Sequence, residues 1–441
     1  MPRPLLSRAS LLCFLALAWG AAAPVAQGAS YDLQPAQAAR LKKFMPRTLA
    51  KLERHEPVTV VELGDSVMDY RMHTEDSGNA LNAYTGVFLQ MLADQFYYVG
   101  GVRLERPRKT QPEKLRDIQG PEIALRKLCA RDRLTMVDGV AALEDLNDAK
   151  QTPPDLMLLD FGVFDAMQHE ELKVYRQALV QIIEFCKKRG MDLFLLGPPL
   201  VMPPPIEKGL GMTRPYAAVM QEEATAHGLF FADLGDLAWL AHVDERWAPL
   251  PAAVDGVATS KKLSLGPPNM EPVEIRVPDG PDPNPENKVQ QFFTELADRY
   301  RKHLDHDETA EDPFHPAPHL HRVLGRRIFA ELMDGSKTSP WKVLPATGDF
   351  SGDNQLTVNF PIENPGTTPL RVFLFPVEVE GWLPRSGQTY LDIPAGSSLP
   401  VSFVYQGSGK EAARALHLPV LVIGQGVPRF EVLRVGTPSA R

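Results

Sequence analysis

The sequence predicts a three-layer α/β/α domain built on a parallel sheet, followed by a small β-sandwich. Two patterns support this fold class. Within residues 30–340, short apolar runs alternate with amphipathic stretches of about a dozen residues or more, which is typical of βαβ units. Within residues 345–441, short strand-like runs are separated by turns rich in Pro and Gly, which is typical of a sandwich. A chain of 441 residues is long enough for these two domains.

The expected elements of the first domain follow from the spacing of apolar residues. Continuous apolar runs predict strands that are buried on both faces, and apolar residues at helical spacing predict helices. The predicted strands are residues 58–67, 97–104, 154–162, 192–199 and 229–233. The predicted helices are residues 35–55, 81–96, 170–188 and 214–227, a helix opened by Gly120, Pro121 and Glu122, a helix at 286–304 and a closing helix from Leu320 to Leu332. Residues 241–285 lack steady periodicity, which indicates an inserted loop.

The second domain shows strand patterns at regular spacing. These are residues 355–362, 370–377, 389–393, 399–405 and 416–423, separated by turns such as Asn364-Pro365-Gly366. Strands of this length and spacing predict an immunoglobulin-like sandwich. Trp382 and Phe373 offer two interpretations, a carbohydrate-binding platform or, more commonly for aromatic residues in a small sandwich, its core.

The N-terminus has the three-part layout of a secretory signal peptide over residues 1–29, with Arg3 and Arg8 before an apolar run and small residues after it. The sequence therefore predicts a secreted or periplasmic protein with no transmembrane segment. A net charge of −8 argues against nucleic acid as a partner. Cys129 and Cys186 would remain after cleavage, and the sequence leaves open whether they pair. It also leaves the oligomeric state open.

Ser66 is the first candidate for chemistry. The apolar strand before it ends in Gly64, which can adopt backbone angles that a Cβ would forbid, so the chain can bend sharply there. Ser66 is then expected at the carboxyl end of a strand, where open α/β sheets place their ligands. An ordinary turn or helix cap is the competing interpretation, because Gly-Asp-Ser also occurs by chance.

A serine nucleophile needs a histidine base, and the histidine needs a group that fixes its tautomer. Asp312 and His315 lie three residues apart, in a predicted loop before the closing helix. A short turn of this kind lets the carboxylate reach Nδ1 while Nε2 faces outward. Ser66 near the start and His315 near the end of the domain are therefore predicted to meet at one edge of the sheet, with Asp312 as the third member.

These residues resemble the SGNH (GDSL) hydrolases over roughly residues 55–335. Gly64-Asp65-Ser66 is similar to the block that carries the nucleophile, and Asp312 to Pro316 is similar to the last block. Gly120 is similar to the glycine whose N–H helps to form the oxyanion hole together with that of Ser66. The resemblance implies a flavodoxin-like α/β fold and hydrolysis of esters through an acyl-enzyme, without a cofactor or a metal. His319 and His321 lie near His315 but are better explained as a surface cluster than as metal ligands.

One block departs from the family pattern. The family has Gly-x-Asn-Asp, whose Asn is an oxyanion donor, and this chain has Gly162-Val163-Phe164-Asp165. Phenylalanine cannot donate a hydrogen bond, and losing one such donor costs about 10²- to 10³-fold in rate. Asp65, Phe164 and Asp165 are expected to line the site, and Tyr70 and His73 are weaker candidates.

The expected function is a secreted serine esterase that hydrolyses acyl or acetyl esters, small molecules or polysaccharides, through Ser66, His315 and Asp312. Two alternatives remain open at this point. Phe164 favours a carbohydrate- or envelope-binding protein that has kept the fold without catalysis. An O-acyltransferase would use the same serine and histidine, so these residues do not distinguish it from a hydrolase.

Overall fold

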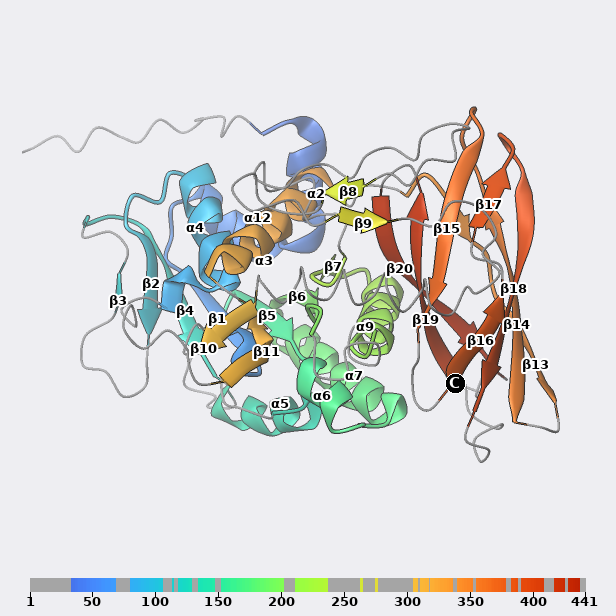
Figure 1. Ribbon diagram of the computed structural model, residues 1–441. Helices are drawn as coiled ribbons and strands as arrows, with labels where there is room; N and C mark the ends of the chain where they lie inside the picture. The colour runs from blue at the N-terminus through green and yellow to red at the C-terminus, as the bar shows by residue number, and fades with distance from the viewer. Residues whose placement is uncertain are drawn as a thin grey trace, which may run out of the picture.

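The three-layer domain and the sandwich lie side by side in a computed structural model of the protein (Figure 1). The structure describes residues 33–68, 80–105, 113–114, 118–128, 134–146, 152–201, 211–236, 262–264, 274–276, 304–307, 310–316, 318–335, 339–351, 354–377, 382–387, 390–407, 416–424 and 427–436. The predicted signal peptide, Tyr70, His73 and Cys129 lie outside these residues.

A seven-stranded sheet in the order β3-β2-β4-β1-β5-β6-β7 forms the centre of the first domain. Its neighbouring strands are parallel except β2 and β3, which pair antiparallel. Because parallel strands end at one edge, residues that follow β1, β5, β6 and β7 gather there. The strands are β1 (Val58–Gly64), β2 (Gly101–Glu105), β3 (Glu113–Lys114), β4 (Glu122–Lys127), β5 (Leu156–Asp160), β6 (Asp192–Gly197) and β7 (Phe230–Asp233).

Helices cover both faces of this sheet, so the predicted α/β/α architecture is confirmed. One face packs against α2 (Pro35–Phe44), α3 (Pro46–Glu53), α4 (Tyr84–Gln95) and α12 (Pro318–Asp334). The other packs against α5 (Met136–Ala142), α7 (Leu172–Arg189) and α9 (Arg214–His227). No helix in the described part of the chain is long and apolar enough to cross a bilayer. Cys186 of α7 is buried as a free thiol, and burial raises its pKa to about 12.

Two predicted helices are wrong in detail. The helix expected after Gly120 is instead strand β4, whose residues Ile123, Ala124 and Leu125 are buried between β2 and β1. The single helix expected over residues 35–55 is two helices that meet at Met45. Proline cannot donate a backbone hydrogen bond inside a helix, and Pro46 therefore begins α3.

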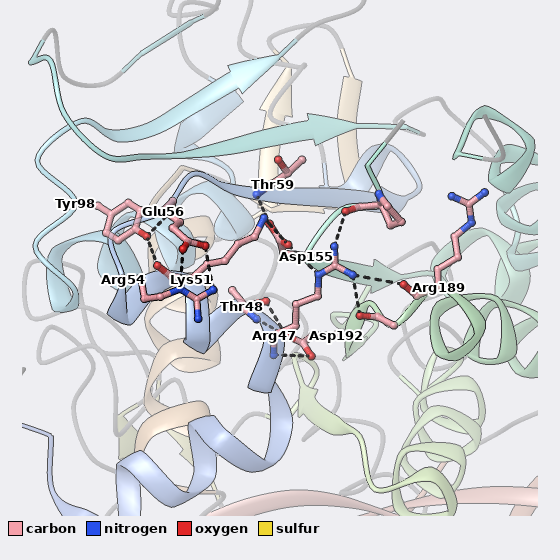
Figure 2. A network of polar contacts seen from close by, with 12 residues as sticks. Arg47, Thr48, Lys51, Arg54, Glu56, Thr59, Tyr98, Asp155, Arg189 and Asp192 are labelled. Atoms are coloured by element: carbon pink, nitrogen blue, oxygen red, sulfur yellow. Dashed lines mark hydrogen bonds and ion pairs between the residues drawn. The ribbon is translucent and has the colours of Figure 1, made fainter. Parts of the chain in front are cut away.

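A polar network fixes α3 to the amino-terminal edge of the sheet (Figure 2). Arg47 and Lys51 bind the buried carboxylate of Asp155 at 3.0 and 2.9 Å. The backbone N–H and the hydroxyl of Thr48 both donate to Asp192, each at 2.7 Å. These two aspartates lie at the starts of β5 and β6, so the network belongs to the edge opposite the carboxyl ends of the strands.

The segment between β7 and α12 is described only in part. Within the predicted insertion, β8 (Lys262–Ser264) and β9 (Glu274–Arg276) pair antiparallel. The helix expected at 286–304 lies outside the described residues except for Leu304, which begins β10 (Leu304–Asp307). Strand β10 pairs antiparallel with β11 (Ala310–Pro316), which leads into α12.

The C-terminal domain has two antiparallel sheets around one apolar core. The first contains β12 (Lys342–Val343), β13 (Thr347–Ser351), β14 (Gln355–Glu363), β16 (Leu383–Gly387) and β18 (Ser398–Gln406), and the second β15 (Leu370–Pro376), β17 (Tyr390–Ile393), β19 (Leu416–Gly424) and β20 (Val427–Val435). The first sheet has the order β12-β14-β18-β16, with β13 also paired to β14, and the second has the order β17-β15-β19-β20. Apart from the short strands β12 and β17, these are the strand orders of an immunoglobulin-like sandwich. Trp382 is buried in this core, and Phe373 packs against the core of the first domain, so neither forms a carbohydrate platform.

The sandwich contacts the α/β domain through β19 and β20, which lie beside α9 (Figure 1). Arg434 of β20 forms an ion pair with Glu222 of α9. Arg429 of β20 lies 3.7 Å from the carboxylate of Asp236, just after β7. These pairs tie the second domain to the side of the sheet that is farthest from β3.

Candidate active site

The turn that carries Ser66 begins at Gly64, the last residue of β1. A Cβ at Gly64 would lie 2.5 Å from the backbone oxygen of Asp160 on β5, which is closer than real Cβ contacts allow. Only glycine fits there, and the chain passes into a single 3-10 turn, η1 (Ser66–Met68). Ser66 is therefore held at the carboxyl edge of the sheet, with 3% of its surface exposed.

His315 lies against this serine although 249 residues separate them. It is the second-last residue of β11, and its Nε2 is 3.0 Å from Ser66 Oγ. The hydroxyl donates to Nε2 when the imidazole is neutral and carries its proton on Nδ1. Both side chains are largely buried, so water competes little for this contact.

Asp312, the predicted third member, lies three residues before His315. The predicted loop over these residues is wrong, because both belong to strand β11. The side chain of Asp312 is outside the described part of the structure, as is that of His319. The role of Asp312 in fixing the histidine tautomer stays a prediction.

Gly120 is not brought to Ser66. In the β1–β4 ladder Val58 pairs with Ile123, so Gly120 precedes the amino-terminal end of β4. Ser66 follows the carboxyl end of β1, a strand of 7 residues, and about 3.3 Å per residue puts the two more than about 20 Å apart. Gly120 packs instead against Val99 and Gly100. The oxyanion role predicted for Gly120 is therefore corrected.

Asp65 lies beside the serine and is almost completely buried. Its Oδ1 accepts a hydrogen bond of 2.8 Å from the backbone N–H of Val67, which holds the turn closed. Burial raises the pKa of this carboxyl well above its ordinary value, and the nearby charge of Asp160 raises it further. The Val67 N–H and the charge of His315 act in the opposite direction.

Phe164 and Asp165 lie in the short helix α6 (Val163–Met167), at the same edge of the sheet. Phe164 is 5% exposed and packs in a small apolar cluster with Val67, the residue after Ser66, and with Val163 and Val201. The position where the family pattern has an amide donor is thus occupied by a ring in an apolar wall.

Asp165 is fully buried, and its Oδ1 accepts the backbone N–H of Met136 at 2.9 Å. It therefore joins α6 to the start of α5. Burial raises the pKa of this carboxyl to about 7, against the lowering effect of the Met136 N–H.

Asp160, which the sequence analysis missed, and His321, which it placed at the surface, complete this region. Asp160 ends β5 and accepts a hydrogen bond from the hydroxyl of Tyr84 on α4. His321, expected at the surface, is instead buried, and its Nδ1 accepts the backbone N–H of Tyr84 at 3.3 Å. The sequence offered one signal for Asp160, namely a carboxylate that directly follows the four apolar residues of a strand buried on both faces.

The fold and the Ser66–His315 contact define the class, an α/β domain with a serine and a histidine at the carboxyl edge of a parallel sheet. The model of the GDSL-like lipase/acylhydrolase family matches residues 63–255. The resemblance noted in the sequence is confirmed for this stretch, which includes Ser66 and ends before His315.

Several solved structures are similar at low identity. A member of the lipolytic protein G-D-S-L family from Veillonella parvula DSM 2008 is 10% identical, with 61% of this chain and 95% of that chain covered and a TM-score of 0.33. The acetyl xylan esterase AlAXEase is 12% identical, with 62% and 98% covered and a TM-score of 0.33. The lipase/acylhydrolase from Enterococcus faecalis is 17% identical, with 40% and 76% covered and a TM-score of 0.28. Similarities this weak carry no argument about function. No curated protein matches the chain.

Proposed function

We propose that the protein is a secreted serine ester hydrolase in which Ser66 is the nucleophile and His315 the general base. The observation that carries this proposal is the distance of 3.0 Å between Ser66 Oγ and His315 Nε2. It lies within the range required for proton transfer between a nucleophile and its base.

The reaction follows from this geometry. Ser66 Oγ attacks the ester carbonyl carbon while its proton moves to His315 Nε2, which gives a tetrahedral oxyanion. Collapse of this species breaks the bond to the alcohol, and the imidazolium returns its proton to the departing alkoxide. Water, deprotonated by the same histidine, then attacks the acyl carbon. The bond to Ser66 Oγ breaks, the acid leaves, and the imidazolium returns its proton to Oγ. In this proposal Asp312 holds the Nδ1–H of His315.

The oxyanion would be stabilised by backbone N–H groups, with that of Ser66 as the donor nearest the new bond. Phe164 supplies no donor, and the N–H of Val67 already donates to Asp65. Oxyanion donors contribute about 3–4 kcal/mol each. A slow hydrolase is therefore expected, one whose rate is limited by formation of the tetrahedral intermediate.

The substrates would be acyl or acetyl esters, including those carried by carbohydrate. This proposed substrate class rests on the predicted export signal and on the β-sandwich that accompanies the α/β domain. Phe164, Val67 and Val201 form a buried apolar cluster next to the Ser66 turn, so the surroundings of Ser66 favour an uncharged acyl group over a charged one.

A fluorophosphonate probe tests the proposal, because it reacts covalently only with an activated serine. The wild-type protein should be labelled, while Ser66→Ala and His315→Ala should not. Ser351→Ala, at an exposed position in the sandwich, is the matched control and should label like the wild type. Correctly folded wild-type protein that resists labelling would refute the proposal.

A binding protein without catalysis is the second candidate, and Phe164 is the observation that favours it. A panel of esters incubated with purified protein distinguishes the two candidates, since a binding protein would leave every ester unhydrolysed. Adding a sugar acceptor to the same reaction tests transfer. Acylated sugar in place of free acid would assign the protein to acyl transfer instead of hydrolysis.

A further inference from the structure

A buried polar cluster of Asp160, Tyr84 and His321 lies directly behind the Ser66 turn, on the face of the sheet covered by α4 and α12. The Tyr84 hydroxyl donates to Asp160, and the Tyr84 backbone N–H donates to His321 Nδ1 at 3.3 Å. The rings of Tyr84 and His321 are stacked, with centroids 5.5 Å apart and an angle of 20° between their planes. One tyrosine therefore contacts the end of β5 and the start of α12 at once.

Asp160 is costly at this position. It follows Leu156 to Leu159 in a strand that is buried throughout, and only 2% of its surface is exposed. Burial raises the pKa of its carboxyl to about 7, and the charge of Glu62 on β1 adds to the effect, while the Tyr84 hydroxyl opposes it. An apolar side chain would fill such a site without this cost. Buried carboxyls with raised pKa values occur most often at functional sites.

The cluster touches both chain segments that supply the reacting groups. Asp160 pairs with Gly64 in the β1–β5 ladder, two residues before Ser66. His321 lies six residues after His315, on the helix that β11 leads into. Helices α12 and α4 are in close contact, since a Cβ at Gly325 of α12 would lie 2.7 Å from the backbone oxygen of Tyr84.

We infer that Asp160 and Tyr84 form a positioning pair that holds the Ser66 turn and the β11–α12 segment in register, so that Oγ and Nε2 stay within reach. The inference rests on the proposed function. Neither residue contacts the reacting atoms, and each acts through its neighbours. A Tyr84 ring freed from Asp160 would leave α4 joined to α12 through the Tyr84 N–H and His321, but without its hydrogen bond to the end of β5.

The test removes this hydrogen bond and leaves the packing in place. Tyr84→Phe deletes only the hydroxyl, and Asp160→Asn keeps an oxygen acceptor but removes the carboxyl. Tyr175→Phe is the matched control, because the Tyr175 hydroxyl is also fully buried and donates to the neighbouring Phe161 backbone oxygen at 2.9 Å, on the opposite face of the sheet. The rate of fluorophosphonate labelling, kcat and KM for a reactive ester, and the melting temperature are measured for these three variants, for the double variant of Tyr84→Phe and Asp160→Asn, and for the wild type.

We expect Tyr84→Phe to lower kcat and the labelling rate by about tenfold to 100-fold, because small displacements of reacting groups have effects of that size. KM should change by less than about twofold, as should every parameter of Tyr175→Phe. Asp160→Asn should fall between Tyr84→Phe and the wild type, and the double variant should match Tyr84→Phe, since both changes affect one contact.

Two results would overturn the inference. In the first, wild-type protein is active and Tyr84→Phe loses no more activity than Tyr175→Phe at a similar melting temperature. In the second, the loss is confined to KM, which would make Tyr84 a substrate-binding residue. Inert wild-type protein would be a different result, because it would refute the proposed function itself and with it any positioning role.

Discussion

Asp165→Asn should reduce the dependence of stability on pH. Asp165 is fully buried, and its pKa in the folded protein is about 7, against an ordinary value of 3.8. Between these two values the folded chain keeps the proton and the unfolded chain loses it. The stabilisation from this group is therefore complete below about pH 4 and is lost as the pH rises to about 7.

The size of the effect follows from the shift. A pKa that is about 3 higher in the folded chain than in the unfolded chain corresponds to roughly 4 kcal/mol of folding free energy in total. About 2.5 kcal/mol of this stabilisation is lost between pH 5 and pH 8. Asparagine has nearly the same shape and can accept the Met136 N–H, but it does not titrate. Its amide nitrogen would replace Oδ2, which has no hydrogen-bond partner among the described residues, so the variant carries a roughly constant penalty of about 1–2 kcal/mol.

Urea unfolding followed by far-ultraviolet circular dichroism provides the measurement, because the described helices all lie in the α/β domain. The free energy of unfolding of the wild type should fall more steeply from pH 5 to pH 8 than that of Asp165→Asn, by about 2.5 kcal/mol. Asp145→Asn, at an exposed position in the same domain, controls for the loss of one negative charge. Parallel curves for the wild type and Asp165→Asn would refute the reasoning.

Two further changes test the two edges of the sheet. Phe164→Asn should increase the esterase rate of the folded protein by about tenfold to 100-fold, because it restores an oxyanion donor. It should also lower the free energy of unfolding by about 3–5 kcal/mol, because a buried ring is lost. An unchanged rate in ester assays would show that this donor does not limit the reaction. Asp155→Asn should lower the free energy of unfolding by about 2 kcal/mol, since Arg47 and Lys51 lose their shared carboxylate, and it should leave kcat unchanged. Denaturant titration measures the first quantity and ester assays the second. A loss of activity at full stability would contradict this structural role.

Most of the fold could be predicted because burial on both faces leaves an unmistakable pattern. Strands β5 and β6 are continuous apolar runs, and α9 follows its apolar spacing from Arg214 to His227. Strand β4 was missed because Ile123, Leu125 and Leu128 fit a helix almost as well as a short strand. Its conformation is decided by pairing with β2 and β1, and partners far away in the sequence leave no trace in a local pattern.

The error over Gly120 has the same origin. A helix that began at residue 120 would follow a strand, so Gly120 would lie at the carboxyl edge with Ser66. Because residues 122–127 form a parallel strand, Gly120 precedes that strand and lies at the opposite edge. Ser66 and His315 were identifiable because short motifs carry their chemistry. Tyr84 was not, since an aromatic residue at the start of an apolar helix has no local feature that distinguishes a core residue from a positioning residue.

The carboxyls of Asp65 and Asp160 next to Ser66 are held in a different way from the carboxylate of Asp155 at the opposite edge, and this difference supports a functional site at Ser66. At the amino-terminal edge Asp155 is neutralised by Arg47 and Lys51, an arrangement that stabilises the fold. At the carboxyl edge Asp65 and Asp160 accept hydrogen bonds from an N–H and a hydroxyl, and neither forms an ion pair with Lys or Arg among the residues that the structure describes. Burial raises both pKa values, and the hydrogen bonds from the Val67 N–H and the Tyr84 hydroxyl offset this rise only in part. Stability alone would favour apolar residues or ion pairs at both edges. Buried carboxyls with raised pKa values cluster at functional sites, and here two of them lie next to a serine that is 3.0 Å from a histidine, which supports a catalytic role for this part of the carboxyl edge.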